Sequence, residues 1–346
     1  MKRNTVMLIG FALSISACGK VGFNKVDDGS FTAAGVKTNA VSQNISVNSD
    51  DQVDILFVVD NSGSMKEEQA NFSSKINGFM DLVKDLDWHV ALTTTDARIN
   101  TVDKNKVERA WGDGQFRPFD SDTGSVFVLK AGEVSLGTAQ AQLAAAIEVG
   151  LLGSGDERAV NSTYRAVQRA ASTPANKDFF RPKARLAVIV ISDENECSDG
   201  KCLATQPTDV PANLLSLVKS TFGNDKIFTF NSIAKMAADT TCTTATLGSV
   251  YETMSQITDG VTGSVCASDY TPLLSKLGTR VKDLVKSVQL GCEPADMNGD
   301  GKGDVTLMGA SGERMTTGFS VTGRLVTFDQ ALSDGLHTFE YHCVAP

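Results

Sequence analysis

The sequence predicts an α/β protein, with a doubly wound, mostly parallel sheet and a small C-terminal β unit. Three observations support this prediction. Apolar runs typical of strands covered on both faces occur at residues 54–60 and 185–191. Segments with helical periodicity alternate with such runs over residues 51–290. From Gly291 onward, short apolar runs separated by glycines replace this alternation.

The first half of the α/β region begins with the strand at 54–60. A helix over 64–86 follows, because its apolar positions recur at helical spacing: Met65, Phe72, Ile76, Phe79, Val83 and Leu86. The next elements, in chain order, are a strand over 88–95, a loop-rich insertion over 97–124, a short strand over 125–129 and helices over 138–149 and 157–171.

The second half continues the alternation after the strand at 185–191. Its elements are a helix over 211–221, a strand over 226–233, a helix over 247–257 and a long helix over 270–289. The C-terminal β unit, over 291–346, contains candidate strands at 305–307, 318–321, 324–328 and 337–341. A unit of this size is marginal alone, so we expect it to dock onto the larger domain.

The N-terminus has the composition of a targeting segment. Lys2 and Arg3 precede an apolar stretch from Val6 to Ile15, which is too short to span a membrane as a helix. The run Ile15-Ser-Ala-Cys18 resembles the lipobox of bacterial lipoproteins. The alternative is an ordinary signal peptide with a cysteine at a chance position.

The lipobox resemblance implies that residues 1–17 are a signal peptide and that Cys18 is lipidated. We therefore expect a protein of the bacterial cell envelope, anchored in a membrane through Cys18, and Gly19 favours the outer membrane. Residues 18–50 are rich in Gly, Ser, Asn and Thr, which predicts a flexible linker with at most a strand near 44–47.

Composition and charge narrow the class of partner. The 346 residues contain 41% hydrophobic residues, enough for one large domain and a small one. The net charge is −9, and loss of Lys2 and Arg3 would make it −11. Because no basic stripe is visible, a nucleic-acid partner is not expected.

Six cysteines remain after Cys18, an even number that predicts disulfides in an exported chain. Proximity in the sequence favours the pairs Cys197–Cys202, Cys242–Cys266 and Cys292–Cys343 among the 15 connectivities that six cysteines allow. A zinc site is the alternative, but the spacings do not fit one and the chain has only 3 histidines.

Oxygen-bearing side chains gather where the two apolar strands end. The first strand runs into Asp60-x-Ser62-x-Ser64, and the second is followed by Asp193. Ligands bind at the carboxyl ends of strands in open α/β sheets, so these side chains are candidates for a shared cation site. The alternative is a helix capping box, in which Ser64 and Glu67 satisfy backbone amides.

The Asp60-x-Ser62-x-Ser64 turn resembles the metal-ion-dependent adhesion site of von Willebrand factor A domains. That resemblance, over roughly residues 51–290, implies a Rossmann-like α/β fold. It also implies Mg²⁺, Mn²⁺ or Ca²⁺ at Asp60, Ser62, Ser64 and Asp193, with one position open to a carboxylate of a partner protein. The Thr that the family supplies from a second loop is missing, and Glu157 is the candidate in its place. The alternative is that Glu157 only favours the helix dipole.

A second candidate site lies at residues 296–304. Asp296, Asn298, Asp300 and Asp304 occupy positions 1, 3, 5 and 9 of a calcium loop, and Gly301 occupies its sharp turn. Position 12 is a leucine, so the segment is not an EF-hand; it resembles the Ca²⁺ loops of FG-GAP repeats. The alternative is a turn rich in Asp and Gly that binds no metal.

These features favour a binding module that uses its cation for protein–protein or cell-surface adhesion. An envelope scaffold, in which the metal only stabilises the fold, is the runner-up. No enzyme is expected, because the sequence has no Gly-x-Ser-x-Gly elbow and no phosphate-binding loop. A hydrolase that activates water on the metal would have to use Glu157 or Glu194 as its base.

Overall fold

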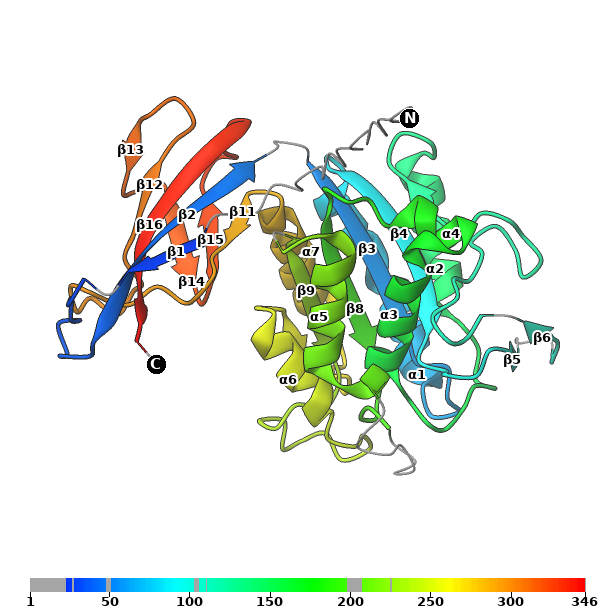
Figure 1. The fold of residues 1–346 in the computed structure, drawn as a ribbon. Helices are drawn as coiled ribbons and strands as arrows, with labels where there is room; N and C mark the ends of the chain where they lie inside the picture. Colours follow the sequence, from blue (N-terminus) through cyan, green and yellow to red (C-terminus); the bar gives the residue numbers. More distant parts are fainter. Residues whose placement is uncertain are drawn as a thin grey trace, which may run out of the picture.

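The computed structural model describes residues 23–26, 28–47, 51–102, 106–109, 111–197, 207–224 and 226–345. Its largest sheet has the strand order β10-β9-β8-β3-β4-β7, of which β9, β8, β3 and β4 are labelled in Figure 1. Neighbouring strands pair in parallel except β7, which is antiparallel to β4. The bounds are β3 Gln52–Val59, β4 Asp87–Thr94, β7 Leu129–Lys130, β8 Arg185–Ile191, β9 Phe228–Ile233 and β10 Thr262–Gly263.

Helices cover both faces of this sheet. Alternate residues of β3 explain why, since Ile55 and Phe57 belong to one apolar cluster and Leu56 and Val58 to the other. The first cluster includes α1 (Lys66–Val83), α2 (Leu136–Ile147) and α7 (Thr271–Leu284). The second includes α3 (Ala159–Gln168), α4 (Pro174–Phe179), α5 (Pro211–Phe222) and α6 (Ser249–Ile257).

A second unit, made of antiparallel strands, lies beside the larger one (Figure 1). One of its sheets has the order β1-β2-β16-β12-β13 and the other the order β11-β15-β14. The bounds are β1 Phe23–Val26, β2 Thr38–Val47, β11 Ser287–Gln289, β12 Val305–Met308, β13 Arg314–Met315, β14 Phe319–Thr322, β15 Leu325–Phe328 and β16 Gly335–Val344. Both sheets contribute to one apolar cluster, which includes Val41, Val326 and Phe339.

The predicted fold class is therefore corrected. Among the described residues, the chain is not a doubly wound parallel sheet with a small C-terminal unit: antiparallel sheets make up a large share of it, and its largest sheet is mixed. The β unit is also not C-terminal alone, because β2 pairs with β16 along its whole length. The sequence concealed this because β2 lies in a stretch poor in large apolar residues, and it becomes a strand only by pairing with a distant one.

Two element predictions also differ from the structure. The predicted helix over 270–289 ends at Leu284, and residues 287–289 form β11, which pairs with β15. Val288 continued the apolar spacing of the helix but is buried in the β unit. In the insertion, β5 (Thr101–Val102) and β6 (Glu108–Arg109) form a two-stranded sheet.

The disulfide prediction is confirmed for two pairs. Cys242 bonds Cys266, and Cys292 bonds Cys343. Cys197 is also disulfide-bonded, while its predicted partner Cys202 lies outside the described residues, as does Cys18. In the part of the chain that the structure describes, no helix has the length and apolarity needed to cross a membrane.

Candidate metal site

Two neighbouring strands bring Asp60 and Asp193 to the same edge of the central sheet. Asp60 follows the last residue of β3, and its backbone N–H donates to the carbonyl of Ile191, the last residue of β8, at 2.9 Å. Asp193 lies two residues beyond Ile191. The two acidic turns that the sequence placed about 130 residues apart are thus joined by the parallel pairing of their strands.

A backbone amide and a hydroxyl group donate hydrogen bonds to the Asp60 carboxylate, which is fully buried. Its Oδ1 accepts a hydrogen bond from the Ser62 backbone N–H at 2.8 Å. Its Oδ2 accepts one from the Ser192 hydroxyl at 2.6 Å. The Ser62 and Ser64 hydroxyl oxygens are 3.1 Å apart. The predicted Asp60, Ser62 and Ser64 therefore form one cluster, to which the structure adds Ser192.

Asp193 completes the cluster, and one of its carboxylate oxygens is available to bind a metal ion. Its side chain is only 7% exposed, and its Oδ1 has no hydrogen-bond partner among the described residues. Burial raises the pKa of the Asp193 carboxyl and the Glu194 charge adds to this, while a hydrogen bond with the Ser64 side chain opposes it. Ser64 itself is exposed, so the cluster reaches the surface there.

The electrostatics of the site favour a bound cation. Burial raises the pKa of Asp60 to about 7; the nearby Asp193 charge adds to this, while the Ser192 and Ser62 hydrogen bonds oppose it. Among the described residues, the groups that shift the pKa values of Asp60 and Asp193 include no cationic side chain. Two buried carboxyls without a counter-ion are costly to ionise, and a divalent cation removes that cost.

Two residues of α1 take part although the sequence analysis did not single them out. The Gln69 amide donates to the Asp60 carbonyl at 2.7 Å and to the Gly150 carbonyl at 3.0 Å, which ties the first loop to the second. Burial raises the pKa of Glu68, and the Asp193 charge raises it further. Glu68 Oε2 has no hydrogen-bond partner among the described residues. The sequence could have indicated Glu68 and Gln69, because they lie about one helical turn after Ser64.

The second loop approaches the first through a glycine. The Gly153 N–H donates to the Asn61 carbonyl at 2.8 Å, and a Cβ at Gly153 would lie 2.3 Å from the Asn61 Cγ. Only glycine permits this approach without moving Asn61, which is buried. The glycine-rich stretch before α3 therefore positions the two loops against each other.

Glu157, the predicted substitute ligand, is fully buried just before α3. Its backbone pairs with Asp96, which follows β4 by two residues. The charges of Glu157 and Asp60 both raise the pKa of Tyr251, whose shift is caused mainly by burial. Both carboxyls therefore act on Tyr251, and the ligand role of Glu157 stays a prediction. The Thr163 hydroxyl donates to the Ala159 carbonyl inside α3.

The capping alternative for Ser64 is not observed. Helix α1 begins at Lys66, its N-cap residue is Met65, and no side chain caps it. The Ser64 hydroxyl contacts Ser62 instead of the helix amides. This leaves the Ser64 side chain available as a ligand.

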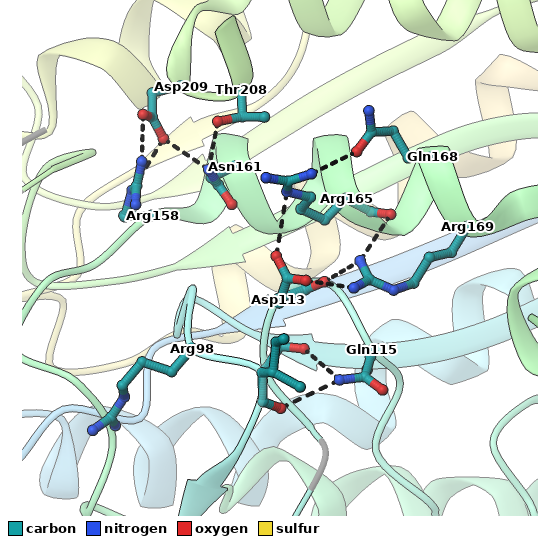
Figure 2. Close-up of polar contacts among 12 residues, drawn as sticks. Arg98, Asp113, Gln115, Arg158, Asn161, Arg165, Gln168, Arg169, Thr208 and Asp209 are labelled. Atoms are coloured by element: carbon teal, nitrogen blue, oxygen red, sulfur yellow. Dashed lines mark hydrogen bonds and ion pairs between the residues drawn. The ribbon is translucent and has the colours of Figure 1, made fainter. Parts of the chain in front are cut away.

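Helix α3 holds the loop that carries Asp193. The buried Glu196 carboxylate accepts hydrogen bonds from the Val160 and Asn161 amides at 2.8 and 2.9 Å. Figure 2 shows two further contacts of this helix region: Arg158 pairs with Asp209, and the Asn161 amide donates to Thr208 at 2.7 Å. The loop after β8 is therefore fixed at both of its described ends.

Acidic, histidine and cysteine side chains are not sufficient by themselves to form a metal site in the described part of the chain. Among the described residues, no group of three or more His, Cys, Asp or Glu side chains is placed to hold a metal ion. The cluster at Asp60 combines two carboxyls with hydroxyls, and such hard oxygen donors suit Mg²⁺ or Ca²⁺, with water filling further positions.

The second predicted site, residues 296–304, forms a compact loop in the β unit. Asp296 accepts hydrogen bonds from the Gly299 and Gly301 amides at 2.6 and 2.8 Å. Asp304 accepts one from the Met297 amide at 2.7 Å. Asn298 and Asp300 accept local amides in the same way. These bonds also fit a turn without metal, so calcium binding here stays a prediction.

Comparison with known proteins gives no family for the chain. No family model and no curated protein matches it. Similar solved structures include the pilus adhesin SpaC from Lactobacillus rhamnosus GG, with 11% identity, a TM-score of 0.40 and coverage of 93% of this chain and 43% of that one. The pilus adhesin RrgA from Streptococcus pneumoniae has 10% identity, a TM-score of 0.36 and coverage of 88% and 58%.

Two other similar structures are of proteins that are not described as adhesins. Proximal thread matrix protein 1 from the mussel byssus has 13% identity, a TM-score of 0.38 and coverage of 69% of this chain and 49% of that one. The human COPII-coat protein Sec24c has 11% identity, a TM-score of 0.39 and coverage of 88% and 42%. The chain thus spans less than two thirds of each, and likeness this low does not assign a function.

Proposed function

We propose that the chain is a binding module that holds a divalent cation between the acidic turns that follow β3 and β8, and uses it to engage a partner protein. The observation that carries the proposal is the Asp193 carboxylate, which is buried beside Asp60. Among the described residues, one of its oxygens has no hydrogen-bond partner, and no cationic side chain is among the groups that shift its pKa.

The ligands would be Asp60, Ser62, Ser64 and Asp193, with Mg²⁺, Mn²⁺ or Ca²⁺ as the ion. The resemblance of the Asp-x-Ser-x-Ser turn to a metal-ion-dependent adhesion site supports this assignment. A shell with two carboxylates and two hydroxyls leaves coordination positions for water or for an incoming carboxylate. Ser64 is the exposed member of the set, so a partner would approach from its side.

The resemblance of Ile15-Ser-Ala-Cys18 to a lipobox supports a place in the bacterial envelope, on the outer membrane. A lipid anchor would hold the module at a surface, where a cation-dependent contact serves adhesion. The competing role is a scaffold whose cation only stabilises the fold, and the burial of Asp60 and Ser62 favours that role.

Thermal unfolding with and without metal tests the cation site. We expect Mg²⁺ or Mn²⁺ at millimolar concentration to raise the melting temperature of the wild type by several degrees, as binding to the folded state alone requires. Asp193→Asn should abolish the rise. The matched control is Asp81→Asn, an exposed aspartate of α1, which should keep it. An equal response of wild type and Asp193→Asn would refute the site.

A capture experiment separates adhesion from scaffolding. Immobilised wild-type protein should retain an envelope protein in Mg²⁺ and release it in EDTA, whereas Asp193→Asn should retain none. If the metal stabilises the fold and capture is the same with and without EDTA, the cation is structural and the adhesion proposal is wrong.

A further inference from the structure

A cavity of about 500 Å³ lies between the larger unit and the β unit. Its walls come from β2, from the segments preceding β8 and β9, and from β11 with the neighbouring Arg324. It lies at the opposite end of the central sheet from the candidate metal site, because it includes Arg185, the first residue of β8, whereas Asp193 follows the last. Figure 1 shows β11 beside the helical layer that contains α7.

The charge of this lining is unlike that of the chain as a whole. The cavity is lined by Lys183, Arg185, Lys219, Lys226 and Arg324, and by no Asp or Glu among the described residues. The chain has 41 acidic and 32 basic residues and a net charge of −9. Like charges gathered in one concave site raise the local positive potential, which an anion relieves.

Three of these cations are available to a ligand. Lys183 and Lys219 are exposed and Arg324 is half-buried, and the described part of the chain gives none of the three an ion pair. Arg324 acts on Asp259 electrostatically, where its charge opposes the burial that raises the Asp259 pKa. Lys226 is already engaged, since it donates to the Arg181 carbonyl at 2.8 Å.

The remaining lining combines polar and apolar side chains. The polar ones are Gln43, Ser46, Asn224, Ser287 and Gln289, and the apolar ones include Ile45, Val47, Phe222, Ile227 and Val288. Phe222 also receives the Lys226 ammonium 4.9 Å above its ring, so the charged and apolar parts of the lining adjoin. A volume near 500 Å³ is within the roughly 300–1,000 Å³ typical of pockets for small molecules.

We propose that this cavity binds an amphiphilic anion, a molecule with a phosphate or carboxylate group and a short apolar chain. Lys183, Lys219 and Arg324 would bind the anionic group. The apolar chain would lie against Val47, Phe222 and Val288. A fully polar anion would leave that apolar wall uncovered, and a neutral amphiphile would leave three cations unpaired.

Calorimetric titration of the full chain with monodecyl phosphate, below its micelle concentration, tests the proposal. We expect saturable binding that is at least about tenfold weaker in the triple variant Lys183→Gln, Lys219→Gln, Arg324→Gln, because three charge-assisted contacts are lost. The control variant Lys84→Gln, Lys276→Gln, Lys282→Gln removes three exposed charges from α1 and α7 regions and should bind like the wild type.

Two further probes complete the test. Decyl maltoside, which has the same chain without the charge, and inorganic phosphate, which has the charge without the chain, should each bind at least about tenfold more weakly than decyl phosphate. Equal affinity for either probe, or equal binding by the two triple variants, would overturn the proposal. Asp193→Asn should bind decyl phosphate normally, so this result is separable from failure of the metal site.

Vesicles distinguish the source of the anion. If the wild type sediments with phosphatidylcholine vesicles only when they contain phosphatidylglycerol, and the triple variant does not, the anion is a membrane lipid. Binding of decyl phosphate without sedimentation assigns the cavity to a free amphiphile. Both outcomes support the proposal, whereas absence of decyl phosphate binding contradicts it.

Discussion

At the scale of single residues, the candidate metal site depends on which carboxylates have a cationic partner. Asp54 and Asp60 are both fully buried and belong to the same strand region. Asp54 binds the Arg181 guanidinium, with Arg181 Nε 2.8 Å from its Oδ1. Asp60 has hydroxyl and amide donors instead. A buried carboxylate that is paired with an arginine has a structural role, whereas a buried carboxylate without a cationic partner can bind an added metal ion.

Asp54 gives a prediction about pH. Burial raises its pKa to about 6, although Lys226 and Arg181 oppose this. The unfolded chain releases this proton near pH 4 and the folded chain near pH 6, so the wild type loses stability as the pH rises between these values, by up to about 3 kcal/mol. Asp54→Asn cannot titrate and should lack this loss.

Urea unfolding of both proteins at pH 4 and pH 6.5 checks this. The stability of the wild type relative to Asp54→Asn should fall between the two pH values. A relative stability that rises with pH instead would mean that the ion pair with Arg181 outweighs the cost of burial.

At the scale of elements, the insertion between β4 and β7 is held against α3. The Asp113 carboxylate contacts the Arg165 guanidinium at 3.3 Å and also pairs with Arg169, as Figure 2 shows. Gly114 has a positive φ of 73°, and a Cβ there would lie 2.4 Å from the Ala166 backbone nitrogen. The loop therefore reaches the helix backbone only because residue 114 is glycine.

We predict that Gly114→Ala destabilises the protein by about 2–4 kcal/mol, since both strain and a backbone clash result. Gly132→Ala is the matched control: it has a φ of 80° with nothing within 4 Å of its Cβ. It should cost only about 1–2 kcal/mol, from strain alone. Urea unfolding of the two variants measures the difference, and equal losses would contradict the close approach.

At the scale of the whole molecule, the N-terminal region completes the β unit. Strand β2 pairs with β16 from Thr38 to Val47, and on its other edge with β1. Val41, Ile45 and Val47 of β2 enter the apolar cluster of the unit. The two units are therefore interleaved along the sequence, with the larger unit inserted between two strands of the same sheet.

We predict that a chain beginning at Asp51 exposes the edge of β16 and associates in solution, because unpaired edges recruit other strands. A chain beginning at Phe23, which retains both β1 and β2, should stay monomeric. Size-exclusion chromatography with light scattering measures the mass, and hydrogen exchange measures the protection of residues 335–344. Equal mass and equal protection in the two chains would show that β2 is dispensable.

The sequence alone determined the elements whose local pattern is strong. The buried strands at 54–60 and 185–191, the helices over most of 64–86 and 211–221, and two disulfide pairs were predictable, because burial on both faces and helical spacing are properties of neighbouring residues. The acidic turns after the two strands were predictable for the same reason.

Only the tertiary structure decided how distant segments pair. In the folded chain, Ser192 donates a hydrogen bond to Asp60, and Gln69 bonds the carbonyls of Asp60 and Gly150. Strand β2 pairs with β16. The last helix of the larger unit ends at Leu284, and the next residues form β11, which pairs with β15 in the β unit. Each of these contacts joins residues that are far apart in the sequence, and the residues adjacent to them in the sequence do not predict the contact. Burial and hydrogen bonding between remote parts of the chain supply the free energy, and local spacing does not record them.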